Sequence, residues 1–275
     1  MYILPSIFTI AGMAAGFYAI LEVLHASVSE YWHLDNAAKA IGFAFLFDGL
    51  DGRIARMTHT ESDFGKELDS LSDVIAFGVA PAVLAWKWGF QLMPPVLFPV
   101  LASEGQWHVK LTQLGAIACF IFLMTGASRL ARFNITSNPQ PSNPGRPGKK
   151  YFVGLPIPAA AAVLAAVIHF KAGEPVESWY MALTWAMMVI TIGYLMVSTW
   201  RFFSFKDIDL SKRRPFRLAV FIGALIAGLW FFSRPVFFFI AMLYMIAGVF
   251  WRLQWMFRRR SGSPPPPVRE APQAS

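Results

Sequence analysis

Long apolar runs recur along this chain, and they constrain its fold more than any other feature. Most of them are close to the ~20 residues that a helix needs to cross the hydrocarbon core of a bilayer. With 56% hydrophobic and only 15% charged residues, the 275-residue chain is too apolar for a soluble domain of its size. The eight runs cover roughly residues 4–24, 37–54, 68–88, 111–130, 155–170, 179–200, 216–232 and 236–257. The sequence therefore predicts an all-α, polytopic integral membrane bundle of about eight transmembrane helices.

The basic residues are distributed unevenly between the two sides of such a bundle. With eight spans and a cytoplasmic N-terminus, most of the 24 Lys and Arg residues fall on the inside. This bias predicts a protein of the inner (cytoplasmic) membrane with both termini in the cytoplasm. The net charge of +8 does not indicate a nucleic-acid partner, because the basic residues are spread over every inside loop. Contact with anionic lipid head groups explains them. The basic residues on or near the outside are Lys39, Lys87, Lys110, Lys171 and Arg234.

Four aspartates stand at helical spacing within this apolar context. Asp48 and Asp51 are three residues apart at the inside end of the second run, and Asp69 and Asp73 are four apart at the start of the third. Residues at these spacings share one helix face, so two helices could direct all four carboxylates at one point. Carboxylates packed that closely need a cation, and oxygen ligands favour Mg²⁺, Mn²⁺ or Ca²⁺ over zinc. We expect the cation also to bind phosphate oxygens of a nucleotide or pyrophosphate substrate.

The stretch from Asp48 to Asp73 also holds small and basic residues at fixed spacings. In order, the pattern is Asp48, Asp51, Gly52, Ala55, Arg56, Gly65, Asp69 and Asp73. It resembles the signature of the CDP-alcohol phosphotransferases, and so many fixed spacings make a specific motif. Residues 65–81, 128–134 (SRLARFN) and 152–160 (FVGLPIPAA) are similar to the phosphatidylserine synthase branch of that family. The resemblance covers roughly residues 1–200.

The resemblance implies the fold of that family and a metal-dependent transfer of the phosphatidyl group from CDP-diacylglycerol to L-serine, with release of CMP. It places Mg²⁺ or Mn²⁺ on Asp48, Asp51, Asp69 and Asp73, and it makes Asp73 the general base on the serine hydroxyl as well. It further implies a homodimer. The substrates would meet at the cytoplasmic face, while the acyl chains of the lipid stay in the bilayer.

Other residues of this region are candidates for binding the substrates. Gly52, Ala55 and Gly65 would leave space for the cytidine and ribose of the nucleotide. Arg56 could hold a phosphate, or it could pair with Asp48 or Asp51. Three basic residues at the same membrane level could bind the lipid phosphate or the serine carboxylate, or could be ordinary inside charges at helix ends. They are Lys66, Arg129 and Arg132.

Three alternative functions remain open from the sequence. A sister enzyme with the same core would use another alcohol, such as glycerol 3-phosphate or inositol. A cation transporter would also carry intramembrane carboxylates, but these would lie near the middle of the membrane. A structural membrane scaffold gives no reason for the aspartates and glycines to stand at these spacings.

The remaining segments give weaker indications. His25, Glu30, His33 and Asp35 have irregular spacing, which predicts a solvated loop between Glu22 and Asn36 rather than a metal site. We expect residues 1–257 to form the transmembrane catalytic domain. Residues 258–275 contain a run of prolines and predict a disordered cytoplasmic tail.

Overall fold

The computed structural model describes residues 3–58, 63–94, 104–135, 151–203, 223, 227–229 and 231–260. Within these ranges it describes the backbone alone for residues 3–5, 52–58, 63, 104–106, 151 and 258–260. The elements are α1 (Ile3–His25), α2 (Trp32–Thr58), α3 (Asp63–Asp73), η1 (Val74–Val79), α4 (Ala80–Trp86), η2 (Lys87–Gln91), α5 (Glu104–Ile135), β1 (Tyr151–Val153), α6 (Ile157–Phe170), α7 (Trp179–Val197), β2 (Arg201–Phe203) and α9 (Ser233–Arg260). The two η elements are π-helical, and α3, η1, α4 and η2 follow one another without interruption.

Five helices are long and apolar enough to cross a membrane, and they coincide with five of the predicted runs. The second predicted run lies within α2. The fifth, except for its first two residues, forms α6, an apolar helix shorter than the five spans. The run at 216–232 lies mostly outside the described residues. The prediction of a polytopic, helical integral membrane protein is confirmed. The five spans are Ser6–His25, Phe64–Gln91, Trp107–Ile135, Trp179–Val197 and Ser233–Phe257.

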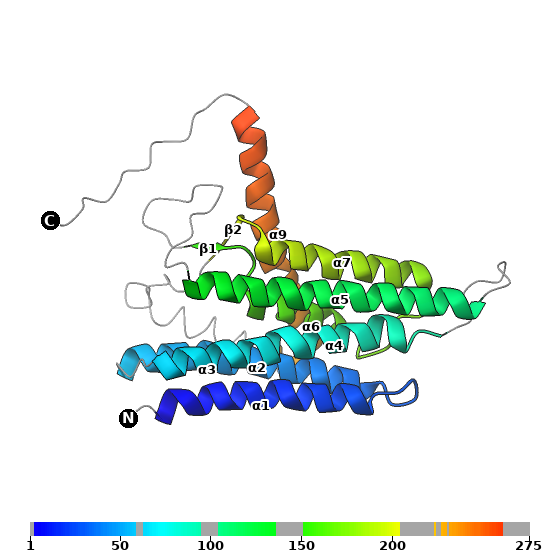
Figure 1. The fold of residues 1–275 in the computed structure, drawn as a ribbon, viewed down its shortest axis with the longest axis horizontal. Coiled ribbons are helices and arrows are strands. Elements are labelled where there is room, and N and C mark those ends of the chain that lie inside the picture. The colour runs from blue at the N-terminus through cyan, green and yellow to red at the C-terminus, as the bar shows by residue number, and fades with distance from the viewer. Residues whose placement is uncertain are drawn as a thin grey trace.

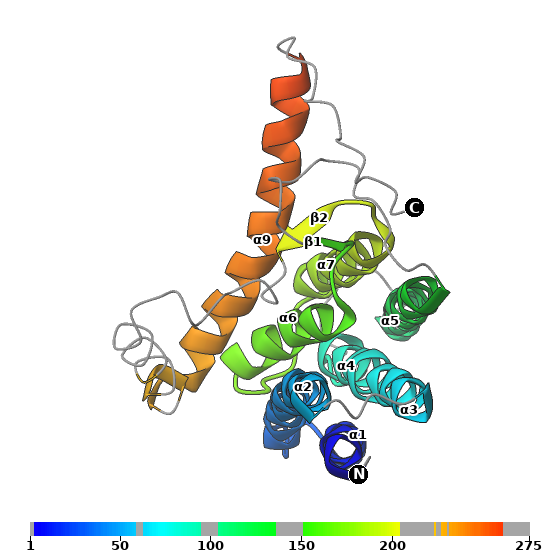
Figure 2. The same ribbon diagram turned by 90° about the vertical axis from the view of Figure 1, so that its left-hand side faces the viewer.

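Helices α1 to α7 form a bundle whose members run side by side, and α9 leaves this bundle at a steep angle (Figures 1 and 2). α1 packs against α2, α5 packs against α7, and α6 contacts both α2 and α9. Helix α6 is buried along most of its length because alanine and valine dominate its sequence. Small side chains let helix backbones approach closely, and close packing is what holds helices together when lipid surrounds them.

A close contact joins α1 to the π-helical segment η1. A Cβ atom at Gly16 would lie 2.6 Å from the Cα of Ala76, so only glycine permits this approach. Ala76 lies in η1, which begins directly after Asp73. Segments of π-helix are rare and are frequent at functional sites. The contact therefore holds α1 against the helix that carries Asp69 and Asp73.

A short two-stranded antiparallel sheet, which the sequence did not predict, lies beside the helices. β1 pairs with β2, with Phe152 opposite Phe202. Helix α7 ends at Val197, before the end of the predicted run at residue 200, and the chain then turns into β2. Gly154 has a φ of 75°, which favours glycine, and its N–H donates to the carbonyl oxygen of Trp200 at 2.8 Å. Three-residue strands are too short to produce a periodic signal in the sequence.

We call the end of the bundle that carries Asp48, Asp51, Asp69 and Asp73 the aspartate end. The two-stranded sheet lies at this end as well (Figure 1). The connection between α1 and α2 lies at the opposite end.

A buried polar network joins three helices at the opposite end. Oδ1 of Asp35 in α2 lies 2.6 Å from Nδ1 of His169 in α6, and Oδ2 accepts a hydrogen bond from Lys39 at 2.8 Å. The second ring nitrogen of His169 lies 3.0 Å from Oγ of Ser233, the first residue of α9. Asp35 and His169 are both buried.

The connection from α1 to α2 also has fixed side chains. Nδ1 of His33 lies 2.8 Å from Oε2 of Glu22, which accepts a further hydrogen bond from Asn36 at 3.2 Å. The prediction of a solvated loop is therefore wrong for Glu22, His33 and Asp35, because these residues lie in or beside helices and have partners there. Glu30 is exposed, as expected.

Candidate active site

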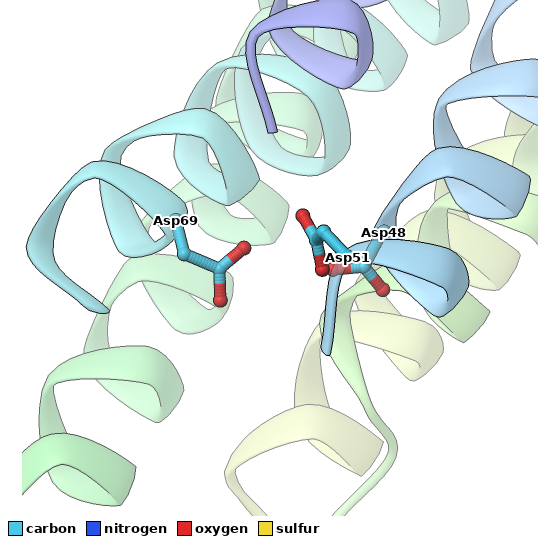
Figure 3. Close-up of side chains that lie close together, drawn as sticks. All are labelled: Asp48, Asp51 and Asp69. Atoms are coloured by element: carbon cyan, nitrogen blue, oxygen red, sulfur yellow. The ribbon is translucent and has the colours of Figure 1, made fainter. Parts of the chain in front are cut away.

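Three carboxylates converge where the aspartate ends of α2 and α3 face each other. Asp48 and Asp51 project from the second half of α2, and Asp69 projects from α3 toward them (Figure 3). One carboxylate oxygen from each residue lies within 4.8 Å of those from the other two. Asp48, Asp51 and Asp69 thus form an acidic cluster, as their helical spacing predicted, and two successive helices supply its members.

Helix α1 forms a third wall of this cluster. Thr9 donates a hydrogen bond from Oγ1 to Oδ2 of Asp51 at 3.0 Å, and Asp51 is only 6% exposed. The hydroxyl of Ser72 donates to the backbone carbonyl oxygen of Thr9 at 3.2 Å, which fixes α1 against α3. A small cavity opens between the three helices, and its walls include Thr9, Gly12, Ala44, Asp48, Asp51, Asp69, Ser72, Asp73, Ala76 and Phe77.

Asp73 lines the same cavity but stands beside the three-carboxylate group rather than within it. It is close enough to Asp48, Asp51 and Asp69 to interact with them electrostatically. It is also the last residue of α3, so the π-helical turn of η1 begins at its C-terminal side.

The donor set fits a divalent cation. Three negative charges this close repel one another, and a cation placed between their oxygens offsets that repulsion. Carboxylate oxygens are hard donors, which suit Mg²⁺, Mn²⁺ or Ca²⁺. Asp69 and Asp73 stand in the first half of the continuous span Phe64–Gln91, and Asp48 and Asp51 stand in the second half of α2, so the cluster lies toward one end of the bundle. This placement does not match the position that the transporter alternative requires.

An arginine lies buried next to the aspartates. Arg129 of α5 is 7% exposed, and its Nε has no hydrogen-bond partner among the described residues. It is near enough to Asp73, Arg132 and Tyr244 to interact with them electrostatically. A buried guanidinium nitrogen without a partner is unfavourable, so this nitrogen is available for an anionic ligand.

The other candidate residues have different environments. Arg132 donates from Nη1 to the carbonyl oxygen of Val197 at 3.3 Å, so part of its guanidinium is already used. Lys66 is exposed on α3, and Gly65 is half-buried. The side chains of Gly52, Ala55 and Arg56 lie outside the described residues.

Sequence reasoning missed Thr9, Ser72 and Tyr244 as neighbours of the site. Thr9 and Ser72 are small hydroxyl residues within apolar helices, a class that usually caps its own backbone, so no pattern distinguishes them. Tyr244 lies in α9, more than one hundred residues after Arg129. Only the packing of the helices brings Thr9 to Asp51, Ser72 to Thr9, and Tyr244 to Arg129.

Comparison with known proteins gives consistent results. Residues 2–190 match the family described as CDP-alcohol phosphatidyltransferase. The chain is 32% identical over 265 residues to the CDP-diacylglycerol–serine O-phosphatidyltransferase of Helicobacter pylori, covering 94% of this chain and 92% of the relative. A protein of the same name from Methanocaldococcus jannaschii is 33% identical over 215 residues, which are 78% of this chain and 83% of the relative.

A further relative is the archaetidylserine synthase of Methanothermobacter thermautotrophicus, which is 30% identical over 198 residues, 71% of this chain and 67% of the relative. The family match extends over more than half of the chain and includes all four aspartates. The chain therefore belongs to the CDP-alcohol phosphatidyltransferase family.

Proposed function

We propose that this protein transfers the phosphatidyl group of CDP-diacylglycerol to the hydroxyl of L-serine, producing phosphatidylserine and CMP. The observation that carries the proposal is the convergence of Asp48, Asp51 and Asp69, with Asp73 in the same cavity. The family supplies the CDP-alcohol donor. The names of the relatives support serine as the acceptor. Two relatives are named CDP-diacylglycerol–serine O-phosphatidyltransferase, and the third is named archaetidylserine synthase.

Asp48, Asp51, Asp69 and Asp73 would hold the divalent cation, Mg²⁺ or Mn²⁺. A bound cation supplies positive charge that offsets the negative charge developing on the transferred phosphoryl group and on the leaving CMP. Thr9 orients one of these carboxylates through its hydrogen bond to Asp51. Fixing the orientation of a ligand in this way raises the affinity of a site for its metal.

Asp73 serves as the general base. Its carboxylate accepts the proton of the serine hydroxyl as the serine oxygen forms a bond to the β-phosphorus of CDP-diacylglycerol. The bond from that phosphorus to the oxygen it shares with the α-phosphate breaks, and CMP leaves with the bonding electron pair. The proton later passes from Asp73 to solvent. One enzyme carboxylate thus takes up the proton that the transfer releases. The phosphatidyl group passes directly to serine without a covalent enzyme intermediate.

The remaining candidates bind the substrates. Arg129 holds the serine carboxylate through its buried guanidinium group, and Lys66 and Arg132 contact the lipid phosphate. Gly52, Ala55 and Gly65 leave room for the cytidine and ribose, and Arg56 holds a phosphate of the nucleotide or pairs with Asp48 or Asp51.

In the cell, the protein resides in the inner (cytoplasmic) membrane. The aspartate end faces the cytoplasm, where CDP-diacylglycerol presents its nucleotide and serine is dissolved. The excess of basic residues in the loops on this side supports the orientation. A homodimer, which the family resemblance implies, stays a prediction.

The test is CMP release by purified protein from CDP-diacylglycerol, with L-serine, glycerol 3-phosphate or inositol supplied separately. We expect release with serine only, dependence on Mg²⁺ or Mn²⁺, and loss on chelation with EDTA. Asp73→Asn should lower the rate about 10²- to 10⁴-fold, which is the usual contribution of a general base. Glu67→Gln, an exposed carboxylate on the same helix, is the matched control and should leave the rate unchanged.

Each other outcome corrects a specific part of the proposal. Release with glycerol 3-phosphate or inositol in place of serine would keep the metal site and replace the acceptor. Full activity of Asp73→Asn would remove this residue as the base. No release with any acceptor would overturn the enzyme, and uptake of labelled Mn²⁺ into sealed vesicles would then indicate a cation transporter.

A further inference from the structure

The junction of β2 and α9 is built from arginine and tryptophan side chains. The guanidinium carbon of Arg252 lies 6.0 Å from the centre of the Trp200 ring and 4.8 Å from that of Trp255. The guanidinium carbon of Arg201 lies 5.5 Å from the centre of the Trp251 ring. Two cations are thus placed against three indole rings, at distances where cation–π attraction is significant.

This junction is rigidly assembled. A Cβ at Gly248 would overlap the ring of Phe202, so α9 lies directly on β2. The hydroxyl of Tyr244 donates to the carbonyl oxygen of Phe203 at 3.0 Å. β2 and the middle turns of α9 lie next to each other in both views (Figures 1 and 2). Residues 191–275 lie outside the stretch that matches the family, so neither arginine falls within it.

The position of the junction favours a lipid ligand. It lies at the aspartate end, near the level where α7 ends and where the bilayer interface is expected. From Trp200, a stripe of lipid-exposed side chains leads back along α7 toward the middle of the membrane. The ring centres of Tyr194 and Trp200 are 6.0 Å apart, and Tyr194 and Met187, seven residues earlier, are 56% and 66% exposed.

From this arrangement we infer that Arg201 and Arg252 bind the phosphate of an anionic phospholipid whose acyl chains lie along α7 over Tyr194 and Met187. A guanidinium group can donate two parallel hydrogen bonds to phosphate oxygens while its face stays against an indole ring. Basic sites between transmembrane helices on the cytoplasmic side are suited to anionic head groups. A free phosphate ion makes no contact with apolar side chains, whereas the acyl chains of a lipid do, so the geometry favours the lipid.

The experiment measures lipid retention by the full chain. The protein is placed in nanodiscs of phosphatidylcholine with a fixed fraction of phosphatidylglycerol. Native mass spectrometry then counts the phosphatidylglycerol molecules that stay bound after the protein is released from the nanodisc. We expect an Arg201→Gln/Arg252→Gln variant to retain about tenfold less than the unmodified protein, because each arginine near the membrane surface adds attraction for anionic lipid. Lys110→Gln is the matched control, since Lys110 also lies over an indole ring, that of Trp107, but at the opposite end of α5.

Two further arms keep the result interpretable. Arg252→Lys retains the charge but not the forked geometry, and we expect intermediate retention from it even if the double variant is unstable. Asp73→Asn should retain phosphatidylglycerol like the unmodified protein, which separates this site from the catalytic one.

Equal retention by the double variant and the unmodified protein would overturn the inference. Displacement of the bound lipid by millimolar inorganic phosphate would show a general anion site instead. Retention of phosphatidylcholine as strong as that of phosphatidylglycerol would show an aromatic belt with no role for the charges.

Discussion

At the scale of single residues, Arg129 is the least expected feature of the site. A guanidinium group that is almost completely buried normally satisfies its donors with carboxylates or carbonyl oxygens, yet Nε of Arg129 has no such partner in the described part of the chain. Its neighbour Arg132 is less buried and donates to the carbonyl oxygen of Val197. The two arginines therefore differ in the hydrogen-bond donors that they can offer a ligand, although they are only three residues apart in the sequence.

Arg129→Ala is expected to raise the KM for serine about 10- to 100-fold, because hydrogen bonds to charged groups contribute about 1.5–3 kcal/mol. The KM for CDP-diacylglycerol should change little. Steady-state CMP release at varied serine and varied lipid nucleotide measures both constants. Arg129→Lys should recover only part of the loss, since an ammonium cannot bind a carboxylate through two parallel bonds.

Arg132→Ala is the matched comparison and is expected to have the smaller effect on the serine KM. If Arg129→Ala raised the two KM values equally, the arginine would be supporting the site as a whole and would not be reading the serine carboxylate.

At the scale of elements, the network at the opposite end of the bundle ties α2, α6 and α9 together. Asp35, His169 and Ser233 come from three different helices and form a continuous hydrogen-bonded chain. In α9, only a small share of the spanning segment is buried within the protein, so this contact and the β2 junction are important for its position. Removing the imidazole would leave a buried carboxylate with fewer partners, which is unfavourable.

His169→Ala is expected to destabilise the protein by about 2 kcal/mol, which corresponds to a fall of several degrees in Tm for a chain of this size. Thermal unfolding in detergent, followed by tryptophan fluorescence, measures the change. His25→Ala replaces an exposed histidine at the same end of the bundle and should change Tm by less than a degree or so.

The coupling between partners can be measured as well. If the loss of the Asp35–His169 contact causes the destabilisation, the falls in Tm from Asp35→Asn and His169→Ala should not add in the double variant. Additive effects would mean that the two residues stabilise the fold independently.

At the scale of the whole molecule, the bundle is polarised. The aspartates, Arg129 and the arginine–tryptophan junction lie at one end, and the buried Asp35 network lies at the other. Because the substrates we propose are a membrane lipid with a large soluble head group and a soluble amino acid, catalysis needs the first end to face the compartment that contains both. The distribution of basic residues is the basis of our proposal that this end faces the cytoplasm.

Cysteine labelling tests this orientation. The sequence contains one cysteine, the buried Cys119, so a Cys119→Ala background has no competing thiol. In that background, Glu67→Cys at the aspartate end should react with a membrane-impermeant maleimide only in inverted vesicles. Ser29→Cys at the opposite end should react only in right-side-out vesicles. The reverse pattern would invert the topology and place the catalytic end outside the cytoplasm.

The membrane nature of the protein and the residues of its acidic cluster could be predicted from the sequence alone. Apolar runs must become helices in a bilayer because no water is present to satisfy their backbone groups, so run length predicts spans directly. The spacing of Asp48 and Asp51, and of Asp69 and Asp73, fixes a shared helix face by the geometry of the helix itself. These are local properties, and for them the sequence is sufficient.

Only the tertiary structure decided what surrounds those residues. Thr9 reaches Asp51, His169 reaches Asp35, and Arg252 reaches Trp200, and each pair joins elements that are remote in the chain. The π-helical turn after Asp73 and the three-residue strands leave no periodic trace either. Such contacts depend on how whole helices pack, which is a property of many small contributions summed over the bundle rather than of any short pattern.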